Sequence, residues 1–158
     1  MTDDAVDSDE TDVATDPDET DKNDEDTNPV AEVAERASND PFCETVGIDL
    51  ASVHPGYAET LLTVEERHLN FHGTPHGGAV YALADAAFAA ASNTGSKTAV
   101  ALETNISYFA AVEVGETLRA VAEEAHLGRR TAAYDVRVTD EAGDPVATFR
   151  GRVYRFDD

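Results

Sequence analysis

Residues 77–92 read GGAVYALADAAFAAAS and carry the clearest helical pattern in the chain. The larger apolar side chains recur at spacings of three and four residues, which places them along one stripe of a helix. That stripe comprises Val80, Leu83, Ala84, Ala87, Phe88 and Ala91. Most other residues here are Ala or Gly, so the helix is apolar almost all round and we expect protein to surround it. Asn93, Thr94 and Gly95 predict its end.

Segments with strand-like alternation lie on both sides of this helix. The predicted elements are a short helix over 30–37, strands over 46–50 and 57–65, and four later strands over 98–109, 117–125, 132–139 and 145–155. Strands joined by short turns pair as antiparallel neighbours, so the last four predict a meander. A buried helix with an antiparallel sheet of five to six strands wrapped around it is an α+β layer fold.

Two of these strands have a marked alternation of side chains. In the strand over 98–109 one face comprises Val100, Leu102, Thr104, Ile106 and Tyr108, and in the strand over 145–155 the predicted inward face comprises Ala147, Phe149, Gly151 and Val153. A sheet of this size has edges to cover, so we expect two copies of the chain to pair.

The amino-terminal segment has a different composition from the rest. Residues 1–28 contain 13 Asp or Glu and one Lys, within a chain of 158 residues and net charge −22. Such a segment buries too little apolar surface to fold, so residues 1–29 are predicted to be a disordered acidic tail and 30–158 a single domain. The negative charge disfavours nucleic acid and anionic membranes as partners. Two Lys against nine Arg in so acidic a chain is similar to the composition of proteins from salt-loving organisms.

The remaining composition narrows the class of protein further. Cys43 is the single cysteine, which excludes an intrachain disulfide and a thiolate metal cluster. The five histidines have no spacing typical of metal ligands, so we expect neither a metal nor a cofactor. There is no secretory signal pattern and no membrane-length apolar run, which predicts a soluble, cytoplasmic protein.

Residues 70–78, NFHGTPHGG, are the first candidate for a functional site. This loop delivers Gly77 and Gly78 to the amino terminus of the long helix, where backbone N–H groups lack partners and the helix dipole is positive. Glycine lets another group approach those amides, which suits an anion or a carbonyl oxygen that is becoming one. The alternative is a tight turn that only begins the helix.

Asp85 is the second candidate, because it lies among alanines in the same apolar helix. A partly desolvated carboxylate can act as a general base or a nucleophile. The alternative is a carboxylate on a wet side of the helix or one bonded to a neighbouring strand. Gly77 and Asp85 are eight residues apart, or about 12 Å along a helix. If both act on one substrate, Gly77 of one subunit must face Asp85 of another.

The run NFHGTPHGGAVYALADAAFAAASNTG resembles the phenylacetate-pathway (PaaI-type) thioesterases of the hotdog superfamily. The shared pattern is Asn, Gly, His-Gly-Gly and Leu-Ala-Asp, and the likeness extends from Asp40 to Phe156. It implies a hotdog fold and an acyl-CoA thioesterase in which the Gly77 amide polarises the thioester carbonyl. Asp85 of the partner subunit would activate water or attack directly.

The resemblance implies roles for further positions. Asn70 and His76 would orient the substrate and support the loop, although a purely loop-stabilising role is an alternative for His76. Gly78 and Asn93 would line the substrate site, and Arg129 and Arg130 would meet the phosphates of CoA. For Asn93 a capping role, and for the two arginines an exposed turn, explain the residues equally well.

Two other functions fit the same residues. One is a sensor that binds acyl-CoA without turnover, and the other is a hydroxyacyl-thioester dehydratase that uses His76 and Asp85. The His-Gly-Gly loop favours the thioesterase. The acyl group is expected to be aromatic or of medium chain length, because Ala86, Ala89 and Ala90 leave room on the helix, and the assembly is expected to be at least a dimer and by analogy a homotetramer.

Overall fold

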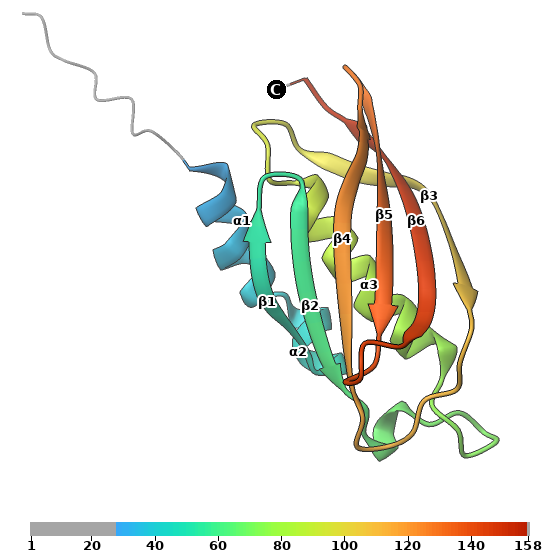
Figure 1. Ribbon diagram of the computed structural model, residues 1–158. Coiled ribbons are helices and arrows are strands. Elements are labelled where there is room, and N and C mark those ends of the chain that lie inside the picture. The colour runs from blue at the N-terminus through green and yellow to red at the C-terminus, as the bar shows by residue number, and fades with distance from the viewer. Residues whose placement is uncertain (1–27, 158) are drawn as a thin grey trace, which may run out of the picture.

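The computed structural model describes residues 28–157, which form one antiparallel sheet wrapped around a long helix (Figure 1). The elements in chain order are α1 (Pro29–Ser38), α2 (Pro41–Val46), β1 (Ile48–His54), β2 (Tyr57–Thr63), a 3-10 turn (Glu66–His68), α3 (Gly77–Ser92), β3 (Ala99–Tyr108), β4 (Thr117–Leu127), β5 (Thr131–Thr139) and β6 (Pro145–Arg155). The predicted α+β class, the sheet of five to six strands and the central helix are confirmed. Among the described helices, none is both long and apolar enough to span a membrane.

The core lies between α3 and the concave face of the sheet. Leu83, Ala87 and Phe88 of α3 are fully buried there, as the helical stripe predicts. The Phe88 ring packs against Tyr134 of β5 and Phe149 of β6. Gly151 of β6 makes this possible, because a Cβ at that position would lie 2.6 Å from the ring. The smallest residue of the predicted inward face of β6 therefore makes room for the largest fully buried side chain of the helix.

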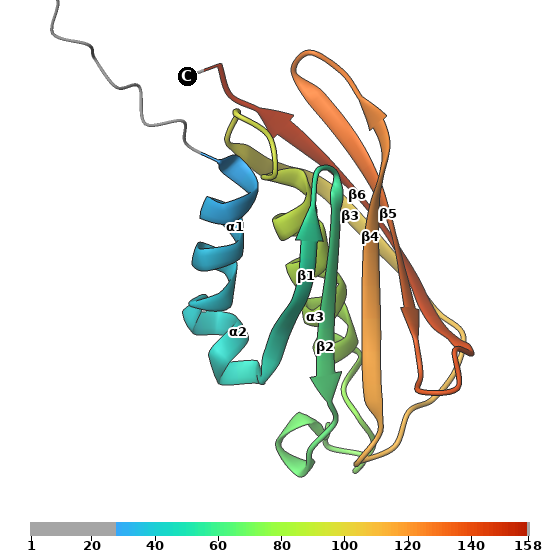
Figure 2. The ribbon, with the colours of Figure 1, turned by 60° about the vertical axis from the view of Figure 1, so that its left-hand side comes forward.

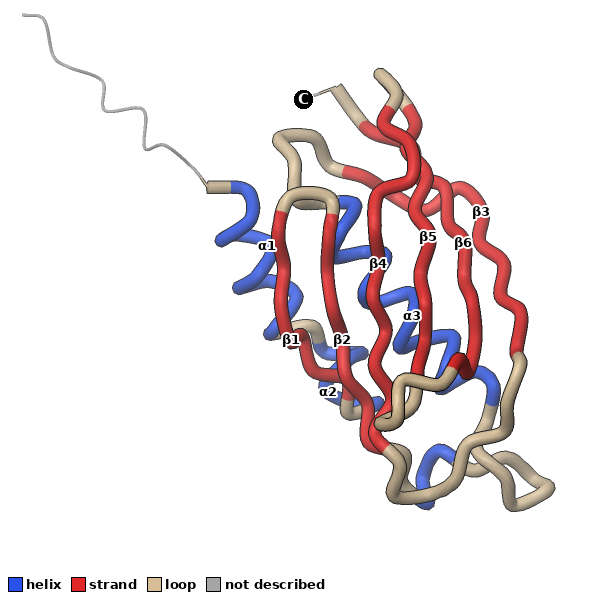
Figure 3. The backbone as a smooth tube through the Cα atoms, viewed as in Figure 1, coloured by secondary structure: helices blue, strands red, loops and turns tan. Residues whose placement is uncertain are grey.

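The order of strands in the sheet differs from the predicted meander. The order is β1-β2-β4-β5-β6-β3, so β4 pairs with β2, and β3 pairs with β6 at the far edge (Figure 3). The prediction that β3 and β4 are neighbours is wrong. The connection over 109–116 is long enough to carry the chain from one edge of the sheet back to its middle. There β4 pairs along β2, whose edge would otherwise be open.

The single shared face predicted for alternate residues of β3 is interrupted. A β-bulge between Ala101 and Glu103 adds one residue to the strand. The extra residue breaks the alternation at Leu102, so Thr104 and Ile106 stay partly covered, whereas Val100 and Leu102 are about half exposed. In β6, the predicted inward residues are all buried.

The helix α2, which follows α1, was not predicted from the sequence pattern. The preceding helix α1 ends at Ser38, and Asp40 then caps α2 by accepting hydrogen bonds from the N–H groups of Phe42 and Cys43 at 2.9 Å. Pro41 fits at the first position of a helix because its missing N–H would have no partner there. As a result β1 begins at Ile48, two residues later than predicted.

The helices α1 and α2 lie on the side of α3 that faces away from β4 to β6 (Figure 2). The predicted helix over 30–37 is confirmed as α1, which Asn28 caps by accepting from Val30 and Ala31. The prediction for the acidic tail, residues 1–29, lies outside the described residues except for Asn28 and Pro29. In one chain the predicted enclosure of α3 is incomplete, because Ala89 is exposed and Asp85 is only half-buried.

Candidate active site

The loop before α3 is closed by Asn70. Its side-chain Oδ1 accepts hydrogen bonds from the N–H groups of His72 at 2.9 Å and Thr74 at 3.2 Å. Its backbone N–H donates to the carbonyl oxygen of Thr74 at 2.8 Å. Asn70 therefore shapes the loop that leads into α3.

His76 is the residue that caps α3. Its Nδ1 accepts a hydrogen bond from the Gly78 N–H at 2.8 Å, so this ring nitrogen carries no proton. Two glycine amides lie at the helix amino terminus, and that of Gly78 is already hydrogen-bonded to His76. The Gly77 N–H finds no acceptor within residues 28–157, and it lies at the positive end of the helix dipole. The arrangement leaves one amide open to an incoming oxygen.

Tyr108, at the end of β3, packs directly over Gly77. Its hydroxyl donates to the Gly77 carbonyl oxygen at 2.8 Å. A Cβ at Gly77 would lie 3.1 Å from the phenol ring and its oxygen, a contact so tight that the ring or the helix would have to shift by a few tenths of an ångström. Burial, and then the nearby Tyr81, raises the pKa of Tyr108, so its hydroxyl stays protonated as a donor. This contact holds the first turn of α3 against the edge strand.

Asp85 lies two turns further along α3, and it is half-buried. Burial raises the pKa of its carboxyl above the ordinary value for Asp. In the part of the chain that the structure describes, the carboxylate has neither a hydrogen-bond donor nor an ion-pair partner. Because α3 is a regular helix from Gly77 to Ser92, the two candidates are about 12 Å apart along its axis. One chain does not bring Gly77 and Asp85 together.

Asn93, predicted to bind substrate, is held by the backbone at the end of α3. Its Nδ2 donates to the carbonyl oxygens of Ala89 at 3.0 Å and Ala99 at 3.2 Å, and its Oδ1 accepts from the Ala99 N–H at 2.9 Å. These bonds tie the helix to the start of β3. Its amide is fully used, so its contact with a nearby cavity is made without free hydrogen-bonding groups.

Arg129 and Arg130 are exposed in the β4–β5 turn. This turn lies at the opposite end of the sheet from the start of α3 (Figure 1). The carboxyl of Asp157, which pairs with Lys97, lies close enough to this turn to interact with Arg130. Its pKa is lowered chiefly by its ion-pair partner Lys97 and to a smaller degree by Arg130 and Arg155. The turn is therefore a basic spot on an acidic chain.

One supporting residue of the loop was missed. His68 is buried, with Nδ1 accepting from the Glu65 N–H at 2.9 Å and Nε2 donating to the Val46 carbonyl oxygen at 2.7 Å. Its own carbonyl oxygen accepts from the His76 N–H at 2.7 Å. The three-residue spacing from Glu65 to His68, similar to a capping box, was the available signal. Across residues 28–157, no three His, Cys, Asp or Glu side chains are grouped to hold a metal ion.

Comparison with known proteins identifies the family. Residues 72–147 match the family described as Thioesterase superfamily. The chain is 38% identical over 117 residues to the acyl-coenzyme A thioesterase PaaI of Escherichia coli (strain K12), and the match covers 74% of this chain and 84% of that protein. This chain belongs to the thioesterase superfamily. The resemblance found in the sequence is confirmed, and the protein is a thioester hydrolase with the hotdog fold.

Solved structures agree with this assignment. The TT0310 protein from Thermus thermophilus is 48% identical, with a TM-score of 0.71, and the match covers 74% of this chain and 98% of that one. The smu.793 protein from Streptococcus mutans UA159, bound to acetyl CoA, is 28% identical with a TM-score of 0.67, covering 70% and 90% of the two chains. The matched part of this thioesterase contains α3, with Gly77 and Asp85.

Tyr108→Phe is expected to lower kcat for thioester hydrolysis by about 2- to 10-fold, the equivalent of one hydrogen bond, and to change KM little. The ring would still pack on Gly77, but the Gly77 carbonyl would lose its donor and the first turn of α3 would be held less firmly. Steady-state kinetics would measure kcat and KM separately. Tyr154→Phe is the matched control, because Tyr154 packs on Phe156 away from α3. Equal kcat for both variants would contradict a positioning role for Tyr108.

Proposed function

We propose that this thioesterase hydrolyses a small aromatic or medium-chain acyl-CoA at a site shared by two subunits. The observation that carries the proposal is the pairing of an open Gly77 amide with a half-buried Asp85 that has no partner among the described residues. The family adds the substrate class, since the E. coli relative is named an acyl-coenzyme A thioesterase.

The two groups have complementary chemistry. The Gly77 N–H would donate to the thioester carbonyl oxygen, and would donate more strongly to the oxyanion that forms when that carbon is attacked. Asp85 would take a proton from water as the water oxygen attacks. The carbon–sulfur bond then breaks, the CoA thiolate leaves and is protonated, and a carboxylic acid remains. The raised pKa of Asp85 brings its basicity closer to that needed near neutral pH.

The shared site follows from distance. A base and an oxyanion donor must both lie within about 3 Å of the reacting atoms, whereas Gly77 and Asp85 of one chain are separated by about 12 Å. We infer that Asp85 of one subunit faces Gly77 of its partner.

The free edge of β3 is the part of the surface best suited to a second copy. Among the described strands β3 pairs only with β6, so within residues 28–157 its other edge has unpaired backbone groups. Four apolar side chains on and just after this strand are between 46% and 59% exposed: Val100, Leu102, Tyr108 and Phe109. Pairing of two β3 edges would cover these side chains and bring Tyr108, and with it Gly77, to the boundary between subunits.

The other residues predicted to meet substrate have supporting parts in this proposal. Asn70 and His76 hold the loop that presents Gly77, and the Gly78 amide is engaged by His76. Arg129 and Arg130 would attract the phosphates of CoA, as phosphates favour paired guanidinium groups. We also retain a homotetramer, a cytoplasmic location and adaptation to concentrated salt as predictions from the sequence.

Release of thiol from a panel of acyl-CoAs tests the function. We expect one CoA thiol and one free acid per substrate consumed, without metal or cofactor. Binding of acyl-CoA with no release would instead identify a sensor. Consumption of a hydroxyacyl-CoA with its thioester intact would identify a dehydratase.

A further inference from the structure

Three arginines at one end of the sheet differ from those on its outer surface. Within residues 28–157, each exposed arginine on the sheet surface has an acidic partner on a neighbouring strand, and these pairs are Arg119–Glu59, Arg137–Glu123, Arg150–Asp135 and Arg152–Glu103. Arg129, Arg130 and Arg155 have no ion-pair partner among the same residues, and Arg36 of α1 shares this condition. An acidic domain thus leaves positive charge uncompensated at this end.

These arginines lie close to one another and to Lys97. Arg155 donates from its backbone N–H to the Arg130 carbonyl oxygen at 2.8 Å, and from its guanidinium to the Gly128 carbonyl oxygen at 2.9 Å. Lys97 pairs with Asp157, and the pKa of that carboxyl is lowered chiefly by Lys97 and further by Arg130 and Arg155. We define the basic corner as Lys97, Arg129, Arg130 and Arg155.

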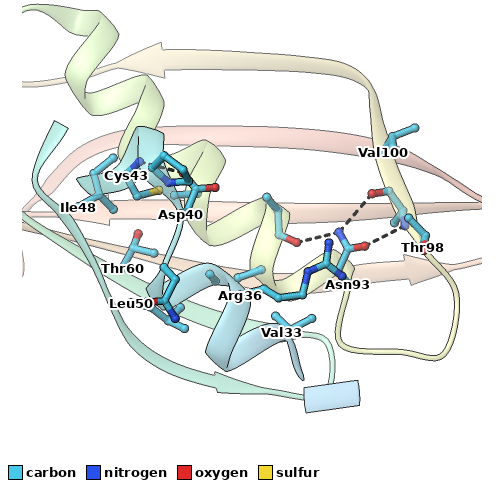
Figure 4. A pocket seen from close by; sticks show the side chains of 17 residues that line it. Val33, Arg36, Asp40, Cys43, Ile48, Leu50, Thr60, Asn93, Thr98 and Val100 are labelled. Atoms are coloured by element: carbon cyan, nitrogen blue, oxygen red, sulfur yellow. Dashed lines mark hydrogen bonds between the residues drawn. The ribbon is translucent and has the colours of Figure 1, made fainter. Parts of the chain in front are cut away.

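The acidic tail joins the domain at the same end of the molecule. Its charged part, residues 1–27, contains 13 Asp or Glu and one Lys, and leads into Asn28, which caps α1. Figures 1 and 2 both show the start of α1 toward the end of the molecule that carries the β4–β5 turn and the end of β6. The loop with Lys97 lies beside α1 as well, because Val33 of α1 and Thr98 line one cavity (Figure 4).

We propose that the acidic tail lies over the basic corner and competes there with the phosphates of CoA. Opposite charge supplies the attraction, since residues 1–27 have a formal charge of −12, from 13 acidic side chains and one lysine. A chain of 27 residues spans up to about 90 Å when extended, so the tail can reach every part of the corner. The competition rests on the function proposed above, in which Arg129 and Arg130 attract those phosphates, whereas the docking of the tail does not.

Tethering makes the tail an effective competitor although each of its contacts is weak. A segment joined to its target by a short stretch of chain has an effective concentration in the mM range. The attraction depends on salt, because charges act over about 10 Å at 0.1 M salt and over about 3 Å at 1 M. The acyl-CoA is also held at Gly77 by a hydrogen bond that salt does not screen in this way. Salt should therefore release the tail and restore affinity for the substrate.

A full-length variant with a neutral tail tests the proposal. In it the 13 Asp and Glu of residues 1–27 are replaced by Asn and Gln. In about 0.1 M KCl we expect its KM for an acyl-CoA to be about 2- to 10-fold below that of the wild type, with kcat unchanged. In about 1 M KCl the two KM values should agree. Isothermal titration with CoA itself should show the same change in Kd, and this measurement requires no turnover.

Two pairs of substitutions locate the effect. In a full-length chain with Arg129→Gln and Arg130→Gln, neutralising the tail should leave the Kd for CoA unchanged, because the tail has lost its docking site. Arg137→Gln with Arg150→Gln is the matched control, since these two arginines lie on the sheet surface and have acidic partners. In that background, neutralising the tail should lower the Kd as much as it does in the wild type.

Backbone amide chemical shifts report docking directly. Residues 128–131 should differ in shift between the wild type and the neutral-tail variant in about 0.1 M KCl, and the shifts should converge in about 1 M KCl. Identical shifts at both salt concentrations would overturn the docking. Equal Kd values for CoA with and without the tail charges, or a tail effect that persists without Arg129 and Arg130, would overturn the competition. Failure of the wild type to hydrolyse any acyl-CoA would remove the proposed function, while tail-dependent shifts would still establish the docking.

Discussion

Asp85→Asn is expected to lower kcat for thioester hydrolysis by about 10²- to 10⁴-fold, because the amide cannot take a proton from water. Asn has nearly the same shape, and Asp85 has no bond to lose among the described residues, so the fold and the assembly should persist. Steady-state kinetics with size-exclusion chromatography would measure both. Asp49→Asn on β1, an exposed position, is the matched control and should keep full activity. Near-wild-type kcat in Asp85→Asn would show that another group is the base.

The same substitution has a consequence for stability and pH. The pKa of Asp85 is higher in the folded protein than in an unfolded chain because burial disfavours the charged form. The folded state therefore binds more protons in the pH window between the ordinary and the raised value, and the free energy of unfolding falls as the pH rises through that window. At neutral pH Asp85→Asn should melt at the same temperature as the wild type or higher. In the wild type, kcat/KM should fall as the pH drops through the raised pKa.

Gly77→Ala is expected to reduce kcat/KM on the order of 10²-fold, since a small displacement of a positioned group is enough for a loss of that size. The added Cβ would lie 3.1 Å from the Tyr108 ring, so either the phenol or the first turn of α3 must move, and the Gly77 N–H moves with it. Kinetics would be compared with Gly95→Ala, where the nearest atom is 3.8 Å from the added Cβ. Equal activity of the two variants would show that the close contact between Gly77 and Tyr108 does not determine the position of the amide.

Mixing the two defective subunits tests whether the site is shared. In an assembly that pairs one Asp85→Asn subunit with one Gly77→Ala subunit, one of the two sites combines the intact Asp85 with the intact Gly77. Mixed dimers isolated with two different tags should therefore recover roughly half of the wild-type activity per dimer. Mixed dimers as inactive as their parents would place both groups of each site in the same chain.

The sequence allowed the elements of the fold to be predicted more fully than their arrangement. The extent of α3 and of β6 followed from local periodicity, which depends on residues close together in the chain. The place of β3 beside β6 did not, because it depends on which strand edges remain open after the whole sheet is assembled. The helix α2 was missed for a different reason. Asp40-Pro41 both ends one helix and begins another, and local pattern alone favours the first interpretation.

The candidate site was also predictable only in part. The separation of Gly77 and Asp85 follows directly from helical geometry and needs no structure. The His76 ring accepts from the Gly78 amide and leaves the Gly77 amide free, and the orientation of that ring depends on the tertiary structure. Tyr108 contacts Gly77 from 31 residues away, and no local pattern indicates such a contact.

The position of β3 also sets the order in which this protein can mature. β3 is synthesised before β4, β5 and β6, yet its strand partner among the described residues is β6, the last of the four. Until β6 emerges from the ribosome, β3 can contact α3 but has no strand with which to pair. Pairings between distant segments also form slowly, because a long loop must close first. Dimer assembly through β3 would therefore be a late, post-translational step, and loss of the carboxyl-terminal strand would remove both the sheet edge and the means to dimerise.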